Sequence, residues 1–253
     1  MSETCSGQVV LVTGGAAGIG RATAQLFAAR GSTVVVVDVA VEEGQRTVEL
    51  IEQSGGTATF LRSDVSVADD VEAMVKETVA RYGRLDVAFN NAGTECEMAA
   101  ISEATEEDWD RVISINLKGI WLCMKYEIAV MIRQGHGAIV NSSSVVGLLG
   151  QPNMASYVAS KHGVVGLTRA AALECAASSI RVNAVCPAIV DTPMLRRYTG
   201  GDVQQAAELT SQYPTPRITQ PEEVASAVLW LCSAGASYVN GHSLMIDGGL
   251  SVQ

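Results

Sequence analysis

The chain has 253 residues, of which 48% are hydrophobic and 17% charged, and its formal net charge at pH 7 is −10. This composition is typical of a well-packed soluble protein and excludes a disordered chain. The negative charge predicts a surface that repels nucleic acid and anionic membrane. The sequence has no apolar run of about 18 residues and no signal-peptide layout at its start, so we expect a cytoplasmic protein.

Short β-branched runs alternate with helical patterns along the chain. The predicted strands are VVLVTGG from Val9, STVVVVD from Ser32, TATFLRSD, LDVAFNNAG, GAIVNSSS, IRVNAVCP and HSLMIDGG. Between them lie helical periods such as residues 67–83. The alternation predicts an α/β fold, a Rossmann-like doubly wound parallel sheet of about seven strands in a single domain over 1–253. The least regular segment, 193–221, is expected to cover the substrate.

The first predicted strand runs into the segment TGGAAGIG at residues 13–20. Gly14, Gly18 and Gly20 stand at this strand-to-helix turn, where the lack of side chains lets backbone N–H groups approach a pyrophosphate. The positive end of the following helix would stabilise the phosphate charge. The turn predicts a dinucleotide site, with Ile19 as a further contact.

Asp38 ends the second predicted strand and follows Gly18 by 20 residues. An acid at this distance meets the ribose hydroxyls in dinucleotide-binding folds, although a helix cap or a surface acid is the alternative. A carboxylate accepts hydrogen bonds from a 2′-hydroxyl and repels a 2′-phosphate. The positions where an NADP site would supply Arg or Lys hold Ala16, Ala17, Val39 and Ala40. The predicted cofactor is therefore NAD.

Several motifs stand in one order along nearly the whole chain. They are TGGAAGIG at 13–20, DV at 64–65, NNAG at 90–93, Asn116 in INLKG, Ser144 in NSSSVVG, YVASK at 157–161, RVNAVCPAIVDTPM at 181–194 and DGG at 247–249. With these motifs the chain resembles the short-chain dehydrogenase/reductase family. The resemblance implies an oxidoreductase that interconverts a secondary alcohol and a ketone by hydride transfer.

Tyr157 and Lys161 lie four residues apart and share one face of a predicted helix, as an ordinary surface pair also would. The resemblance implies that Tyr157 is the general acid/base. The pKa of a free phenol is about 10, and the charge of Lys161 is expected to lower it. Lys161 is also expected to hold the nicotinamide ribose.

Two further residues complete the implied catalytic set. Ser144 precedes Tyr157 by 13 residues and would donate a hydrogen bond to the substrate oxygen. Ser142 and Ser143 are alternatives in the same run, and strand alternation would let Ser142 face the same way. Asn116 lies inside a helical segment, where the resemblance implies a distortion that frees a carbonyl group for a proton relay.

The resemblance implies more contacts with the cofactor. They are Asp64 and Val65 at the adenine, Asn90, Asn91, Ala92 and Gly93 after the fourth strand, and Pro187, Ile189 and Thr192 near the nicotinamide. The chain departs from the family pattern at one position, where Ala188 follows Pro187 in place of the usual glycine. Backbone approach beside the nicotinamide is expected to be slightly more restricted.

The residues implied around the substrate are mostly apolar, which predicts a small alcohol or ketone with a hydrophobic or aromatic group. They are Thr94, Glu95, Val145, Val146, Leu148, Met194, Leu195 and Tyr198. A reductase of 3-oxoacyl chains on a carrier protein is the alternative. Arg196 and Arg197 favour carrier docking, whereas Glu95 and Glu97 oppose it. A nucleotide-sensing protein without catalysis would be expected to lack part of the catalytic set.

The resemblance also implies a homo-oligomer, usually a tetramer. The predicted helix around Tyr157 is rich in small residues that permit close helix packing, although a buried helix within one chain would look the same. The six cysteines and three histidines are scattered without metal-ligand spacing, so no metal site is expected.

Overall fold

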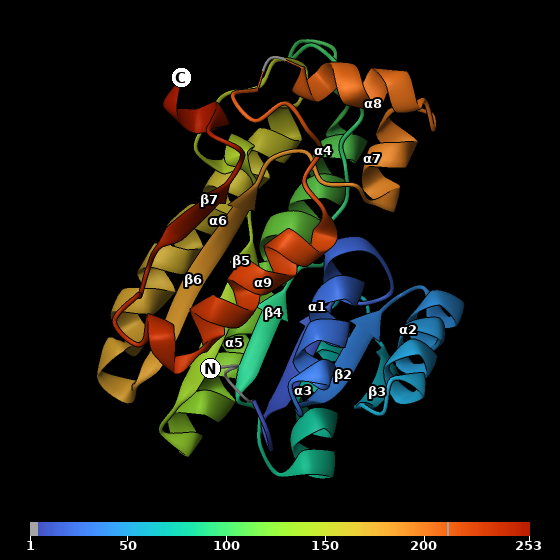
Figure 1. Ribbon diagram of the computed structural model, residues 1–253. Helices are drawn as coiled ribbons and strands as arrows, with labels where there is room; N and C mark the ends of the chain where they lie inside the picture. Colours follow the sequence, from blue (N-terminus) through green and yellow to red (C-terminus); the bar gives the residue numbers. More distant parts are fainter. Residues whose placement is uncertain (1–4, 212) are drawn as a thin grey trace.

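The computed structural model describes residues 5–211 and 213–253, which contain one seven-stranded parallel sheet (Figure 1). The strands are β1 Val9–Thr13, β2 Thr33–Asp38, β3 Thr57–Arg62, β4 Val87–Asn90, β5 Gly137–Ser142, β6 Ile180–Pro187 and β7 Ser243–Ile246. Their order across the sheet is β3-β2-β1-β4-β5-β6-β7. This order confirms the predicted doubly wound fold, and every predicted strand is present.

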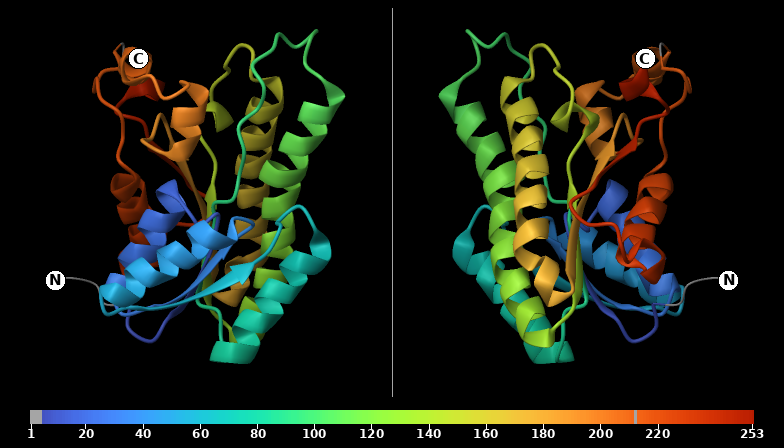
Figure 2. Two further views of the ribbon diagram at one scale, coloured as in Figure 1. Left: turned by 90° about the vertical axis from the view of Figure 1, so that its right-hand side faces the viewer. Right: turned by 90° about the vertical axis from the view of Figure 1, so that its left-hand side faces the viewer.

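Helices cover both faces of the sheet (Figure 2). One layer holds α1 Gly18–Ala29, α2 Val41–Gln53 and α9 Pro221–Cys232. The other holds α3 Ala68–Tyr82, α4 Glu106–Ile113, α5 Gly119–Gln134 and α6 Ala155–Cys175. Short helical turns connect the elements, namely η1 Ser114–Lys118, η2 Val145–Gly147, η3 Ala176–Ser178, η4 Ala234–Ala236 and η5 Leu250–Val252.

The sheet is buried on both faces, which explains why its strands read as continuous apolar runs. Phe27 of α1 and Leu231 of α9 are fully buried in the core on one side. Met74 of α3 and Met131 of α5 are buried in the core on the other side. Because both faces of the sheet are covered by apolar packing, polar side chains can gather only at the ends of the strands.

The strand order reverses between β1 and β4, which lie side by side although two strands separate them in sequence. The chain leaves β1 toward one sheet edge and leaves β4 toward the other. Loops after these two strands diverge and leave space at their carboxyl ends, where open α/β sheets bind ligands. Gly14 follows β1 and Asn91 follows β4 at this point.

The segment predicted to cover the substrate contains two short helices, α7 Pro193–Tyr198 and α8 Val203–Thr210. Both lie beyond the carboxyl ends of the strands, at the top of Figure 1. Thr192 caps α7, and Asp202 caps α8 with bonds to the N–H groups of Gln204 and Gln205. Residue 212, within the predicted cover, lies outside the described residues. No helix of the described part of the chain is long and apolar enough to cross a membrane.

Candidate active site

The glycine turn after β1 has the shape that the sequence predicts. Gly14 and Gly18 adopt positive φ angles of 63° and 51°, a region that favours glycine. A Cβ atom at Gly20 would stand 2.0 Å from the carbonyl oxygen of Gly14. No larger residue fits at Gly20 without moving the turn, which leads directly into the N-terminus of α1.

Thr13 and Asn91 join the glycine turn to the end of β4. The Thr13 hydroxyl accepts from the backbone N–H groups of Asn91 at 3.0 Å and Ala92 at 3.1 Å. The Asn91 side chain donates to the carbonyl oxygens of Thr13 and Gly14, each at 3.2 Å. The Asn91 side chain therefore fixes the shape of the turn.

The Asn90 side chain does not reach this edge. Its side chain is fully buried and donates to Glu127 at 3.0 Å and to Asn141 at 3.1 Å. Successive residues of a strand point to opposite faces, so Asn90 faces the core beneath α5. Residues 91–93 follow the end of β4 and form the start of the loop at the carboxyl end of the sheet.

Asp38 lies at the end of β2, beside the glycine turn. Its carboxylate accepts from the backbone N–H groups of Ala16 at 3.1 Å and Ala40 at 3.0 Å. These bonds hold the carboxylate at the sheet edge, which is the position that ribose recognition requires.

Arg21 is a basic residue near this position that the sequence reasoning missed. It extends from α1 to the Glu43 carboxylate of α2 at 2.6 Å and also donates to the carbonyl oxygen of Ala16. It directly follows the turn at 13–20, whereas the positions expected to carry an NADP-binding cation were Ala16, Ala17, Val39 and Ala40. Arg21 is thus already engaged by Glu43 and by the backbone of the turn.

The remaining predicted cofactor contacts lie around the same edge. The Asp64 carboxylate accepts from the N–H of Ser66 at 2.9 Å, and the Val65 side chain packs in the core against Gly119. Thr192 stands against Gly18, where an added Cβ would come within 3.0 Å of the Thr192 methyl group. The start of α7 therefore borders the start of α1.

Tyr157, Lys161 and Ser144 converge at the ends of β5 and β6. The buried ammonium group of Lys161 donates to the carbonyl oxygen of Ser142 at 2.9 Å and lies 5.4 Å from the centroid of the Tyr157 ring. The Ser144 side chain lies close enough to Tyr157 to lower the pKa of its phenol. It also donates to the carbonyl oxygen of Pro187 at 3.4 Å.

The structure also separates the three serines. The Ser143 hydroxyl is buried and donates to the carbonyl oxygen of Lys161 at 2.9 Å. The Ser142 side chain is buried as well. Ser144 is the partly exposed member, and its side chain lowers the pKa of Tyr157.

The predicted lowering of the Tyr157 pKa is wrong for the protein by itself. Burial raises the pKa of Tyr157 to about 12, while the Ser144 side chain lowers it and the charges of Cys96 and Glu95 raise it further. Burial also lowers the pKa of Lys161 to about 8. Desolvation disfavours the charged form of both groups, which the four-residue spacing could not reveal.

Asn116 lies in η1, a π-helical segment between α4 and α5, so the predicted helix distortion is present. The N–H of Gly119 donates to the carbonyl oxygen of Ser114, five residues earlier. The buried Asn116 side chain accepts from the N–H of Thr94 at 2.8 Å and donates to its carbonyl oxygen at 2.9 Å. Asn116 therefore also holds the loop that follows β4.

A nicotinamide dinucleotide fits this edge. The turn of Gly14, Gly18 and Gly20 leads into the N-terminus of α1, where free backbone N–H groups suit a pyrophosphate. Asp38, at the end of β2, presents a carboxylate that suits ribose hydroxyls. Lys161 lies beside Tyr157 on α6, which follows β5 on the other half of the sheet. Fold and site together define an α/β enzyme of the dinucleotide-binding class.

The chain belongs to the short-chain dehydrogenase/reductase family. A family profile described as enoyl-(acyl carrier protein) reductase matches residues 14–251. The chain is 44% identical over 247 residues to a 2,5-dichloro-2,5-cyclohexadiene-1,4-diol dehydrogenase of Sphingobium indicum, covering 97% of this chain and 98% of the relative. It is 41% identical to a cyclohexanol dehydrogenase of an Acinetobacter species, covering 98% and 96%.

Further relatives widen the range of named activities. A 3-oxoacyl-(acyl-carrier-protein) reductase of Thermotoga maritima is 42% identical, covering 97% of this chain and 98% of the relative. Among solved structures, a levodione reductase superposes with a TM-score of 0.95 at 39% identity, covering 97% of this chain and 98% of the other. An NAD+-bound xylitol dehydrogenase superposes with a TM-score of 0.92 at 31% identity, covering 98% and 100%.

Proposed function

We propose that the protein interconverts a small cyclic secondary alcohol and its ketone, with NAD(H) as cofactor and Tyr157 as general acid/base. The observation that carries the proposal is the convergence of Tyr157, Ser144 and Lys161 at the carboxyl ends of β5 and β6. The coarser prediction, an oxidoreductase that acts on a CH–OH group, is confirmed by the named relatives.

The ring in the substrate is suggested by two of these relatives. Their names specify a cyclohexadiene diol and cyclohexanol, both of which carry a hydroxyl group on a six-membered ring. A compact apolar ring also suits the apolar residues that the sequence places around the substrate, such as Val145 and Leu148. Both lie in or next to η2, immediately after Ser144.

In the proposed reaction, the hydroxyl groups of Ser144 and Tyr157 hydrogen-bond the substrate oxygen. During oxidation Tyr157 accepts the hydroxyl proton, and during reduction it donates a proton to the developing alkoxide. Ser144 stabilises the charge on that oxygen. When bound, the nicotinamide would supply the hydride acceptor or donor. Because burial opposes the phenolate, the positive charge of Lys161 is needed to favour it.

The proposed preference for NAD is supported by Asp38. Its carboxylate is held at the end of β2 by two backbone N–H groups, where it would repel a 2′-phosphate. Arg21, a nearby cation, is already bound to Glu43. A 2′-phosphate would therefore be repelled by the Asp38 carboxylate, and Arg21 would have to leave Glu43 to bind it.

Reduction of carrier-bound 3-oxoacyl chains is the second candidate, favoured by the family description and the Thermotoga relative. The structure weakens the argument from the two arginines of α7. Arg197 is bound to Glu95, and Arg196 lies 3.4 Å from Asp191. Neither arginine offers an unpaired charge for docking an acidic carrier protein.

A competition assay separates the two candidates. Cyclohexanone and a carrier-bound 3-oxoacyl chain are supplied with NADH at matched concentrations, and consumption of each is measured. We expect the free ketone to be reduced with the higher kcat/KM. Faster reduction of the carrier-bound chain, weakening as salt is raised, would instead establish the second candidate.

A homotetramer is the proposed assembly. Trp121 and Ile132 of α5 and Leu173 of α6 are exposed on one helical layer, and Leu173 is 82% exposed. Exposed apolar side chains on neighbouring helices are typical of subunit interfaces. Light scattering should give about four times the chain mass of 26.5 kDa. A mass of one chain at micromolar concentration would contradict the assembly.

A further inference from the structure

One buried carboxylate lies between the loop that follows β4 and the helix that carries Tyr157. Asp108 of α4 is only 6% exposed. Its Oδ1 atom accepts from the N–H of Glu97 in the loop at 3.1 Å, and its Oδ2 atom accepts from the hydroxyl of Ser156 at 3.1 Å. Ser156 is buried in the first turn of α6, directly before Tyr157. Asp108 therefore joins the loop to the start of the helix that carries the tyrosine.

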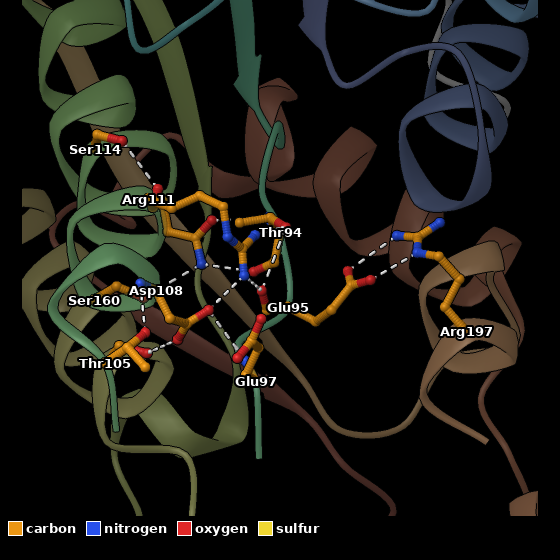
Figure 3. A network of polar contacts seen from close by, with 11 residues as sticks. Thr94, Glu95, Glu97, Thr105, Asp108, Arg111, Ser114, Ser160 and Arg197 are labelled. Carbon is orange, nitrogen blue, oxygen red and sulfur yellow. Dashed lines mark hydrogen bonds and ion pairs between the residues drawn. The ribbon is translucent and has the colours of Figure 1, made fainter. Parts of the chain in front are cut away.

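Arg111, one turn further along α4, holds the same loop at a second place. Its Nη1 atom donates to the Thr94 hydroxyl at 2.7 Å, and its Nη2 atom donates to the carbonyl oxygen of Glu95 at 3.0 Å. Nη2 also donates to Oδ1 of Asp108 at 2.5 Å. Figure 3 shows the side chains of Asp108 and Arg111 extending from α4 to the loop. Because Thr94 and Glu95 are among the residues expected around the substrate, Arg111 fixes the loop at that place.

The Asp108 carboxylate is held in one orientation. Burial raises its pKa, but the bonds from Glu97, Arg111 and Ser156 outweigh this effect and hold the pKa below its usual value. The carboxylate is therefore charged at neutral pH, and hydrogen bonds to a charged group are stronger than those between neutral groups. The N–H of Asp108 donates to the hydroxyl of Thr105, which caps α4, at 3.1 Å. Both the backbone and the side chain of Asp108 are thus fixed.

The loop and the start of α6 also meet through the backbone. The N–H of Ala99 donates to the carbonyl oxygen of Asn153 at 3.1 Å, and Ala99 forms a parallel bridge with Met154. These contacts do not depend on Asp108 or Ser156. We therefore expect variants at these two positions to fold with the loop and the helix in contact.

We propose that Asp108 and Ser156 are positioning residues for Tyr157, whereas Arg111 positions the loop beside the substrate. The bond from Ser156 to Asp108 holds the first turn of α6 at a fixed place relative to α4. The proposal rests on Tyr157 as the acid/base of the function proposed above. Displacement of a reacting group by about 1 Å can lower a rate by about 10²-fold, so a small shift of this turn is measurable.

Steady-state oxidation of cyclohexanol with NAD+ separates the two roles. Ser156→Ala removes the hydroxyl that anchors α6, so kcat should fall by about 10-fold while KM for the alcohol stays close to the wild-type value. Arg111→Met removes the bonds to the loop, so KM should rise by about 5-fold while kcat changes little. Rates are expressed per NADH-binding site, counted by fluorescence titration, so that a loss of folded protein does not lower kcat.

Variants of Asp108 supply a second measurement. Asp108→Ala removes the partner of both the loop and α6, so it should lower kcat and raise KM. Asp108→Asn keeps the shape of the side chain and two polar atoms that can bond Ser156 and Glu97, so kcat should recover most of the loss. In the double variant with Ser156→Ala, kcat should be no lower than in Asp108→Ala alone, because both changes remove the same bond. Losses of kcat that multiply in the double variant would overturn the proposal.

Thr168→Val is the matched control for Ser156→Ala. It removes another buried hydroxyl from α6, one that donates to the carbonyl oxygen of Val164 at 2.8 Å. Its kcat per NADH-binding site should be close to that of the wild type. Arg81→Met, at an exposed arginine of α3 paired with Glu77, is the control for Arg111→Met. Equal losses of kcat in Thr168→Val and Ser156→Ala, or unchanged kinetics in Ser156→Ala, would contradict the positioning role.

Tyr157→Phe distinguishes a failure of this proposal from a failure of the proposed function. If Tyr157→Phe loses turnover while Ser156→Ala and Asp108→Ala keep it, only the positioning role is wrong. If Tyr157→Phe keeps full turnover, the acid/base assignment is wrong and the positioning role fails with it.

Discussion

Lys161 and Ser142 are joined by a hydrogen bond of 2.9 Å from the buried ammonium group to the carbonyl oxygen. The Ser143 hydroxyl returns a bond of 2.9 Å to the carbonyl oxygen of Lys161. These two bonds tie α6 to the end of β5. Tyr157 lies one turn before Lys161, and Ser144 lies directly after the tied serines. The two bonds of Lys161 therefore help to hold the start of α6, which carries Tyr157, against the end of β5.

Lys161→Met tests this arrangement, because it keeps a long side chain and removes the charge. We expect turnover to fall by about 10² or more, since the phenolate of Tyr157 loses its positive neighbour. Nucleotide affinity should also fall if Lys161 holds the ribose. Both are measured by steady-state kinetics and NADH fluorescence titration. Lys125→Met, at an exposed lysine of α5, should leave both unchanged.

Asp38→Ala combined with Val39→Arg is expected to narrow or reverse the preference for NAD+ over NADP+. The change removes the carboxylate that repels a 2′-phosphate and adds a cation that attracts it. The ratio of kcat/KM values for the two cofactors is the measurement. Equal efficiency with both cofactors in the unmodified enzyme would show that Asp38 does not select between them.

Glu127 is a buried carboxyl group beneath the site. It accepts from the Asn90 side chain at 3.0 Å through Oε2, and its Oε1 atom has no hydrogen-bond partner among the residues that the structure describes. Burial raises the pKa of Glu127 to about 7. The folded protein therefore holds a proton that the unfolded chain has already lost above a pH of about 4.3. The free energy of unfolding should fall as pH rises through this window and level off above it.

Glu127→Gln removes this dependence because an amide does not titrate. From pH 5 to pH 8 the variant should gain stability relative to the wild type by on the order of 2 kcal/mol. Urea unfolding at the two pH values gives the difference. Glu77→Gln, at an exposed glutamate of α3 paired with Arg81, serves as the control and should show no such gain. A pH-independent difference for Glu127→Gln would mean that Glu127 is ionised throughout.

The sheet could be predicted almost completely from the sequence. The run VVVV at 34–37 would place apolar side chains on both faces of a strand. Such a strand is stable only in a sheet that is covered on both sides, as β2 is. The glycine turn was equally predictable, because the close approach of Gly20 to Gly14 excludes a side chain. The distortion at Asn116 was predicted from the family resemblance, and the π-helical segment around it is present.

Contacts between segments far apart in sequence were beyond prediction. The bond of Glu95 to Arg197 spans 102 residues, and that of Arg21 to Glu43 joins two separate helices. Neither pair has a spacing that marks it. The pKa of Tyr157 was misjudged because the spacing to Lys161 is visible in the sequence, whereas the burial of the phenol depends on the assembled fold.

Tyr157→Phe tests the central claim most directly, because it removes one hydroxyl group and leaves the ring packing intact. Tyr238→Phe, at a fully exposed tyrosine, is the matched control. Oxidation of cyclohexanol with NAD+ and NADH binding are measured on both. The account predicts that Tyr157→Phe binds NADH with affinity close to that of the wild type and turns over at least about 10²-fold more slowly. Turnover close to that of the control in a folded Tyr157→Phe protein would contradict the assignment of Tyr157 as the acid/base.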